Sequence, residues 1–253
     1  MKPLAIIAAL GLVLAQAEDR RVPVIVELFT SEGCSSCPPA DQLLARLERM
    51  QPVAGARVVA LEEHVDYWNH LGWSDPFSSA QYRVRQNDYA RAFFTESIYT
   101  PQMIVNGIAE FSGGDGKRAL QEIERAAQVQ TTLVDLKTAP NPGNAELVDL
   151  LVQITNPKTG KVRNSNVYLA VTESGLTSNV SAGENSGRRL QHAPVVRNFG
   201  VIGKIASRGT SGGQFTNTLR LPPEWRRESL RAVVFVQEQD SHRITGAGLT
   251  DLR

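Results

Sequence analysis

Two cysteines separated by two serines are the feature that most constrains this chain. Cys34 and Cys37 are the only cysteines among the 253 residues. They follow an apolar run typical of a strand (residues 24–29) and precede a segment with helical spacing. A Cys-x-x-Cys pair at a strand-to-helix junction is typical of a redox site. Because so short a loop restricts the unfolded chain little, the spacing favours reversible chemistry or metal ligation over stabilisation.

The beginning of the chain predicts export. Lys2 gives a basic start, residues 4–14 are apolar, and Ala15 and Ala17 are the small residues that a signal peptidase needs. We therefore expect residues 1–17 to be a signal peptide. The apolar stretch is shorter than the roughly 20 residues that span a bilayer, so an uncleaved anchor is the less favoured alternative. Export would place the mature protein in the periplasm or outside the cell, where a disulfide can persist.

Charge and composition narrow the choice of partners. Lysine plus arginine total 27 against 26 acids, so no excess charge favours nucleic acid or an anionic membrane. No other segment is apolar over the length of a bilayer, and we expect no membrane span after signal cleavage. The chain also has no phosphate-binding glycine loop. The predicted partners are exported proteins or peptides that carry thiols or disulfides, and the sequence leaves the oligomeric state open.

The first part of the chain alternates strands and helices. Strands are expected at residues 22–30, 57–62, 103–105 and 108–111, and helices around 43–50, 77–94 and 117–128. Asn106-Gly107 predicts the hairpin turn. In the first helix the pattern places Asp41 on the solvent side. The order of strand, helix, strand, helix, hairpin and helix is that of thioredoxin. We therefore expect residues 18–130 to form an α/β thioredoxin-like N-terminal domain.

The second part of the chain is a series of short extended segments separated by turns. These segments are residues 133–136, 147–154, 167–171, 195–205, 215–221, 230–236 and 244–249. About seven such strands predict a β-rich, sandwich-like C-terminal domain over residues 131–253. A polar loop in this part contains Glu184, Asn185 and His192. It is either a binding loop or, the interpretation we favour, a contact at the interface between the two domains.

Several motifs resemble those of one bacterial family. Residues 27–41 (ELFTSEGCSSCPPAD) are similar to the opening motif of a family of secreted proteins catalogued as domain of unknown function 1223. Its other motifs are matched by His64-Val65-Asp66-Tyr67-Trp68, Gly72-Trp73, Asp75-Pro76-Phe77, Tyr99-Thr100-Pro101-Gln102 and residues 183–187 and 192–199. The resemblance covers most of the mature chain. It implies a thioredoxin-like fold with an added β-rich region, and it implies no settled activity.

The cysteine pair supplies the candidate catalytic residues. Cys34 would be the attacking nucleophile and Cys37 the resolving thiol, because a helix N-terminus favours the thiolate form. Pro38 and Pro39 complicate this expectation, since proline lacks an amide hydrogen and is tolerated only in a first turn. The helix is therefore expected to begin nearer Cys37 than Cys34, which would weaken the activation of Cys34.

Three further residues are catalytic candidates. Pro101 stands before an expected strand, where thioredoxin-like proteins carry a cis-proline, and we expect the Thr100–Pro101 bond to be cis. Thr100 would then present its backbone to an extended peptide. Glu27 is a candidate buried acid for proton transfer, although it lies one residue further from Cys34 than that role requires.

Aromatic residues and histidines cluster after the second strand. Tyr67, Trp68 and Trp73 are candidates for lining a peptide-binding groove, and packing against the core is their alternative role. Cys34, Cys37 and His64 together would suit copper or zinc. Histidines beside tryptophans are more often packing residues, so the preferred expectation is that no metal or cofactor is bound.

Three functions are consistent with the sequence. The leading hypothesis is an exported thiol–disulfide oxidoreductase that acts on protein or peptide thiols. The first alternative is a periplasmic copper- or zinc-binding or delivery protein. The second alternative is a redox-inert secreted interaction protein of thioredoxin fold.

Overall fold

The computed structural model describes residues 21–129, 132–156, 162–207 and 212–252. The predicted signal peptide (1–17) and the predicted boundary between residues 130 and 131 lie outside the described residues. The first half contains β1 (Val22–Thr30), α1 (Pro38–Met50), β2 (Ala56–His64), η1 (Asn69–Leu71), α2 (Ala80–Phe93), β3 (Gln102–Val105), β4 (Ala109–Ser112) and α3 (Gly116–Ala127).

The second half adds nine strands. They are β5 (Leu133–Pro140), β6 (Leu147–Thr155), β7 (Ser165–Glu173), β8 (Thr177–Asn179), β9 (Arg189–Gln191), β10 (Val195–Ile205), β11 (Gly212–Arg220), β12 (Leu230–Glu238) and β13 (Ile244–Asp251), with a short 3-10 helix η2 (Arg227–Ser229) before β12. The expected strands and helices thus lie close to their predicted positions. The expected helix from residue 77 begins later, at Ala80, because the side chain of Ser79 caps it by accepting from the amide of Gln81.

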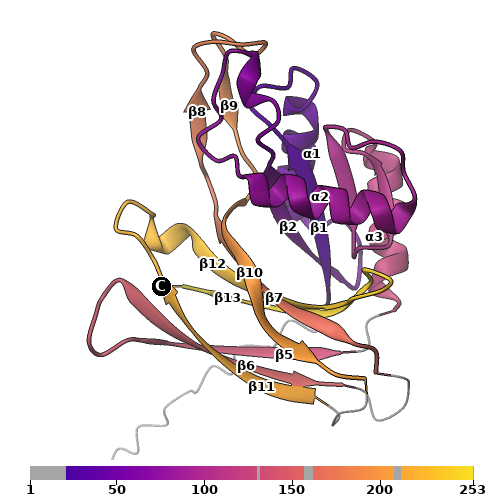
Figure 1. Cartoon of the computed structure of the whole chain (residues 1–253), viewed down its shortest axis with the longest axis vertical. Helices are drawn as coiled ribbons and strands as arrows, with labels where there is room; N and C mark the ends of the chain where they lie inside the picture. The colour runs from indigo at the N-terminus through magenta and orange to yellow at the C-terminus, as the bar shows by residue number, and fades with distance from the viewer. Residues whose placement is uncertain (1–20, 130–131, 157–161, 208–211, 253) are drawn as a thin grey trace, which may run out of the picture.

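One mixed sheet joins the two halves of the chain. Its strand order is β13-β12-β7-β10-β2-β1-β3-β4, so four strands of each half lie side by side (Figure 1). The junction is a parallel contact of β10 with β2, in which Val195 is level with Glu62. The amide of Glu62 donates to the carbonyl of Pro194 across this junction at 3.0 Å.

The expected fold class, a thioredoxin-like α/β domain followed by a β-sandwich-like domain, is therefore wrong. Among the described residues thirteen strands outnumber three α-helices, and the largest sheet belongs to neither half alone. The physical reason is that β2 has a second edge whose backbone groups need partners. β10 supplies partners for that edge, and no periodicity in the sequence shows which distant strand will do so.

Alternate residues of β1 enter two different cores. Val24, Val26 and Leu28 pack with α1 and α3, whereas Ile25 and Phe29 face α2. A third core lies between the second half of the large sheet and a separate sheet of order β11-β6-β5. Both faces of β1 and β2 are therefore covered, and any charged residue on these strands has to be satisfied inside the protein.

Two glycines of β13 allow the three-stranded sheet β11-β6-β5 to cross the eight-stranded sheet. A Cβ atom on Gly246 would lie 2.0 Å from the carbonyl oxygen of Thr132, and one on Gly248 would lie 2.2 Å from that of Val134. Only a residue without a side chain fits so close an approach of two backbones. Strand β5 can therefore pass directly over β13.

Arg85 of α2 is a buried cation that connects the two halves. Its Nε donates to Glu27 of β1, and it lies 3.6 Å from Glu63 of β2. Its guanidinium carbon is 5.1 Å and 4.7 Å from the ring centres of Tyr168 and Phe199, which belong to β7 and β10. Burial, and then the charge of Glu27, raise the pKa of Glu63 well above its usual value. The cation thus balances a buried acidic pair.

Replacing Arg85 should destabilise the fold strongly. Arg85→Met leaves Glu27 and Glu63 buried without a cation, and we expect a loss of about 3–5 kcal/mol in the free energy of unfolding. Urea denaturation at neutral pH measures it. The matched control is Arg91→Ala on the same helix, which removes an exposed pair with Asp88 and should change stability little. A loss below about 1 kcal/mol in the Arg85 variant would contradict this assignment.

Candidate functional site

Cys34 and Cys37 form a disulfide at the beginning of α1. Cys37 is the N-cap and the helix starts at Pro38, which confirms the expectation that it begins nearer Cys37 than Cys34. Pro38 and Pro39 offer no amide hydrogen, and the amides of the next two residues both donate to the carbonyl of Cys37. These first-turn amides are therefore not directed to the sulfur of Cys34.

Both sulfurs are fully buried in this structure. The side chains of Cys34 and Cys37 are 0% exposed, although Ser35 and Ser36 between them are exposed. The hydroxyl of Ser36 lies 3.4 Å from the sulfur of Cys34, within hydrogen-bond distance. A partner can reach the disulfide only if something that covers it moves.

A loop from the second half of the chain, residues 183–188, which we call the cap loop, bonds to the backbone around Cys34. It joins β8 to β9, a hairpin arm that extends from the large sheet to the beginning of α1 (Figure 1). The side-chain amide of Asn185 donates to the carbonyls of Glu32 and Cys34 at 2.8 and 2.9 Å. The carboxylate of Glu184 accepts from the amide of Ser35 at 3.0 Å. The expected interface role of this polar loop is thus what the structure shows for Glu184 and Asn185.

Thr100 and Pro101 lie on another side of residues 31–37, the connection between β1 and α1, which we call the cysteine loop. Their peptide bond is cis, as the sequence predicts. Trp68 connects them to the cysteines, because its indole nitrogen donates to the hydroxyl of Thr100 at 2.8 Å and its Cβ would be 3.1 Å from a Cβ on Gly33. Thr100, Trp68 and the residue before Cys34 are therefore in one contiguous group.

The other two aromatic candidates also point inward. Trp73 is half-buried and donates to the carboxylate of Glu32 at 2.7 Å, and the cap-loop residue Gly183 packs on its Cβ. Tyr67 is half-buried, and its hydroxyl makes no hydrogen bond among the described residues. Trp73 thus contacts both Glu32 and the cap loop, and the role of the three aromatic residues in binding a substrate stays a prediction.

Glu27 does not reach the cysteines. It is buried, but it lies on the face of β1 that α2 covers, where it accepts from the hydroxyl of Tyr89 at 2.6 Å as well as from Arg85. The cysteines lie at the beginning of α1, and α1 packs on the opposite face of β1. The expected role of Glu27 in proton transfer at the disulfide therefore has no geometric support.

A buried cluster of histidines and carboxylates lies at the carboxyl ends of β1 and β2. Nδ1 of His192 and Nε2 of His64 lie 3.1 and 3.2 Å from the same oxygen, Oε1 of Glu62. The other ring nitrogens contact Glu32 and Asp75, at 3.1 Å from His192 and 2.7 Å from His64. All five residues are less than 7% exposed. We call Glu62, His64 and His192 the histidine cluster.

The carboxylates of the cluster govern the protonation of its histidines. Burial lowers the pKa of His64, but Asp75 and then Glu62 outweigh it and hold that pKa well above the usual value. Burial also lowers the pKa of His192, whereas its contacts with Glu32 and Glu62 raise it to about 9. The carboxylates therefore favour the protonated form of both rings.

The predicted copper or zinc ligands do not come together as expected. The sulfurs of Cys34 and Cys37 are bonded to each other, and both ring nitrogens of His64 face carboxylates. In the part of the chain that the structure describes, the group whose ligand atoms lie close enough for one metal ion is Glu62, His64 and His192.

Sequence reasoning missed most of this cluster. Asp41 was expected on the solvent side of its helix, but it is only 4% exposed and accepts from the hydroxyl of Thr30 at 2.6 Å. The signal that could have revealed the cluster is Glu62-Glu63-His64, three ionisable residues in succession at the end of an apolar strand. Residues on a strand covered on both faces have to find partners inside.

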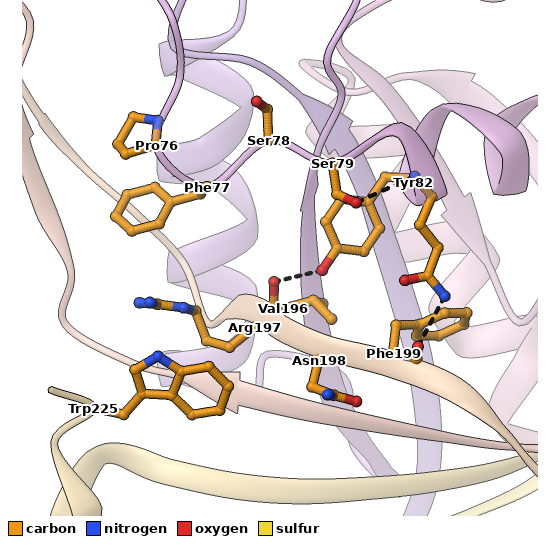
Figure 2. Close-up of a pocket in the computed structure, with 11 residues that line it drawn as sticks. Pro76, Phe77, Ser78, Ser79, Tyr82, Val196, Arg197, Asn198, Phe199 and Trp225 are labelled. Carbon is orange, nitrogen blue, oxygen red and sulfur yellow. Dashed lines mark hydrogen bonds between the residues drawn. The ribbon is translucent and has the colours of Figure 1, made fainter. Parts of the chain in front are cut away.

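A pocket of about 310 Å³ lies beside the histidine cluster, between the segment before α2 and strand β10. Figure 2 shows Phe77, Arg197 and Trp225 along one side of it and Tyr82 and Phe199 along the other. The ring of Phe77 is also 5.5 Å from that of His64 and 5.3 Å from that of His192. Phe77 therefore forms a wall between the pocket and the cluster. None of the predicted site residues lines this pocket.

Comparison with known proteins gives a family and a fold. A family model described as "Protein of unknown function (DUF1223)" matches residues 25–237. The solved structure of protein AGR_C_4864 from Agrobacterium tumefaciens is 27% identical and has a TM-score of 0.67, with 92% of this chain and 96% of that one covered. HBP35 of Porphyromonas gingivalis is 17% identical with a TM-score of 0.63, over 92% of this chain and 76% of that one, and shows the fold alone. No curated protein matches the chain.

Asp41 should make stability depend on pH. Burial, and then the charge of Glu62, raise its pKa from 3.8 to about 8, against the hydrogen bond from Thr30 and the charges of His64 and His192. Because the folded state binds this proton more tightly, the stability it contributes is complete below about pH 4 and is lost as pH rises through about 8.

Asp41→Asn removes this loss. The stability of the variant relative to the natural protein should therefore grow by a few kcal/mol, in order of magnitude, between pH 4 and pH 8. Urea denaturation of both oxidised proteins at pH 4, 6 and 8 measures the difference. A difference that stays constant with pH would show that Asp41 is not protonated at neutral pH.

Proposed function

The chain belongs to the DUF1223 family, and from that premise we propose that it is an exported thiol–disulfide oxidoreductase that acts on protein or peptide thiols through Cys34 and Cys37. The observation that supports this most is the closed Cys34–Cys37 bond beneath the cap loop, a cover fastened by a few polar contacts. In the part of the chain that the structure describes, no helix is long and apolar enough to cross a membrane.

Exchange requires the cap loop to open. Three hydrogen bonds, from Asn185 to two carbonyls and from the amide of Ser35 to Glu184, join it to the cysteine loop. Each contributes about 1 kcal/mol net, so breaking all three costs about 3 kcal/mol and leaves the open state populated below about 1%. Such a disulfide reacts slowly with small thiols. A partner that binds the open state would react faster.

The reaction in the oxidising direction proceeds by two attacks. A partner thiolate attacks the sulfur of Cys34, so the Cys34–Cys37 bond breaks, a partner–Cys34 disulfide forms and Cys37 leaves as a thiolate that takes up a proton. A second partner thiolate then attacks the partner's own sulfur in the mixed disulfide. The partner leaves with a disulfide, oxidised by two electrons, and Cys34 takes up the second proton. The reverse sequence reduces a partner disulfide, and the partner's potential sets the direction.

Asp41 is placed to supply the first of these protons. It lies in the first turn of α1, four residues after the N-cap residue Cys37, a spacing that brings side chains to the same side of a helix. With a pKa of about 8 its carboxyl group holds a proton at neutral pH. A protonated acid one turn from the leaving thiolate lowers the barrier to its departure.

The alternative of a redox-inert interaction protein is favoured by the complete burial of both sulfurs. The two functions differ in the reduction potential that they require of the Cys34–Cys37 disulfide. An oxidoreductase pair has a potential in the range of about −120 to −270 mV, whereas a structural disulfide lies below about −300 mV. Equilibration of the protein with glutathione buffers separates them.

Removing the resolving thiol should trap the intermediate. Cys37→Ser leaves Cys34 without its internal competitor, so incubation with a peptide disulfide should give a stable adduct whose mass increases by one peptide thiol. Mass spectrometry without reductant measures it. The control is Cys34→Ser, which should form at least tenfold less adduct because Cys37 is the resolving rather than the attacking thiol. Equal adduct from the two variants, or a potential below about −300 mV, would contradict the proposal.

Loosening the cap loop should expose the disulfide. Asn185→Ala removes two of the three hydrogen bonds, about 2 kcal/mol, so the rate of reduction by dithiothreitol should rise about 30-fold. The rate is followed by blocking the free thiols at intervals and measuring the mass of the protein by mass spectrometry. Ser186→Ala is the matched control, because this hydroxyl donates to the carbonyl of Ser181 within the arm and not to the cysteine loop. An unchanged rate in the Asn185 variant would show that the cap loop does not limit access.

A further inference from the structure

We propose that Glu62, His64 and His192 form a binding site for a divalent first-row transition-metal cation, for which zinc is the best match. The donor atoms are Nε2 of His64, Nδ1 of His192 and Oε1 of Glu62, and all lie within 4.8 Å of one another. The site is separate from the disulfide and holds whether or not the protein exchanges thiols.

The spacing of the donor atoms fits a small metal ion. The two nitrogens lie 3.2 and 3.1 Å from the carboxylate oxygen of Glu62. Two zinc bonds of about 2.0–2.1 Å that meet at the tetrahedral angle place their donor atoms about 3.3–3.4 Å apart. Both nitrogen-to-oxygen distances are therefore close to those of a tetrahedral zinc site, and the two nitrogens lie within 4.8 Å of each other.

Two buried atoms of the cluster have no hydrogen bond. Oε2 of Glu62 has no hydrogen-bond partner among the described residues, and Nε2 of His64 contacts Oε1 of Glu62 at 3.2 Å without the geometry of a hydrogen bond; the side chains of His64 and Glu62 are 1% and 0% exposed. A buried polar atom without a partner costs about 1–3 kcal/mol, so such atoms call for an explanation. A bound cation satisfies both, with Oε2 of Glu62 as a fourth donor.

The groups around the cluster orient its donors. Asp75 contacts the other nitrogen of His64 at 2.7 Å, and Glu32 contacts the other nitrogen of His192 at 3.1 Å. Carboxylates in these positions are the usual outer partners of zinc-bound histidines, and they direct the remaining nitrogen toward the metal. Asp75 is fixed in turn by the backbone amides of Glu32 and Phe77, each at 2.9 Å.

The donor set selects the kind of metal. Two imidazoles and one carboxylate suit zinc and its neighbours, whereas copper(I) prefers thiolates. The thiols of Cys34 and Cys37 are bonded to each other and offer no thiolate in this state. The neighbouring pocket supplies a route, since Phe77 lines it and also contacts the two histidine rings, so a rotation of Phe77 would connect the pocket to them.

The experiment uses the full oxidised chain after removal of metal with a chelator. Titration with Zn²⁺ should show one equivalent bound per chain at micromolar concentration or below, and Zn²⁺ should raise the midpoint of thermal unfolding. Co²⁺ in its place should give the visible absorption of a four- or five-coordinate site, with no thiolate-to-cobalt band in the near ultraviolet. A thiolate band, or binding only at millimolar Zn²⁺, would overturn the proposal.

Variants assign the ligands. Glu62→Gln and His192→Gln should each weaken Zn²⁺ binding at least 100-fold, whereas His70→Gln, an exposed histidine of η1, should leave it unchanged. Asp75→Asn should keep one equivalent but weaken binding about 10- to 100-fold, and it decides the matter if the ligand variants do not fold. Unchanged affinity in a folded ligand variant, or in the Asp75 variant when the others do not fold, would overturn the site.

The double variant Cys34→Ser with Cys37→Ser separates this site from the proposed exchange reaction. It should retain one equivalent of Zn²⁺ with an affinity within about threefold of the natural protein, although it cannot form a disulfide. Loss of metal binding in this variant would move the site to the cysteines and overturn the assignment to His192. A failure of exchange in the natural protein leaves the metal site unaffected.

Discussion

Three ionisable residues on one buried strand determine how the two halves of this protein fit together. Glu62, Glu63 and His64 end β2, and each is at most 1% exposed. Because consecutive strand residues point to opposite faces, Glu62 and His64 need partners on the α1 face and Glu63 on the α2 face. An unpaired buried charge costs several kcal/mol. His192 contacts Glu62 on the first face, and the cation of Arg85 lies 3.6 Å from Glu63 on the second, so residues of both halves of the chain pack around β2.

The same junction positions the cover of the disulfide. His192 lies three residues before the start of β10, and the chain before it forms the β8–β9 arm that carries the cap loop. Glu32 belongs to both places, since its carbonyl accepts from Asn185 and its carboxylate contacts Trp73 and His192. The histidine cluster and the arm that carries the cap loop are therefore linked through Glu32.

The joining of both halves in one sheet changes the surroundings of the disulfide. In a free-standing domain the rim at the ends of β1 and β2 would be open, and the cysteines would face solvent. Here β10 and its arm occupy that rim, and the sulfurs are buried. The likeness of AGR_C_4864 over 96% of its length indicates that the two halves occur together there as well. A partner that exchanges thiols with Cys34 therefore meets the arm beside it.

The sequence by itself determined the local structure: the periodicity of the strands and helices and the position of Cys37 at the start of α1. These depend on residues within one or two turns of each other, where side-chain pattern and proline geometry act directly. Only the tertiary structure decided that β10 lies beside β2, that Asp41 is buried, and that His192 meets Glu62. Strands join through backbone hydrogen bonds that are alike at every residue, so the pattern of a strand does not show which distant strand will be its neighbour.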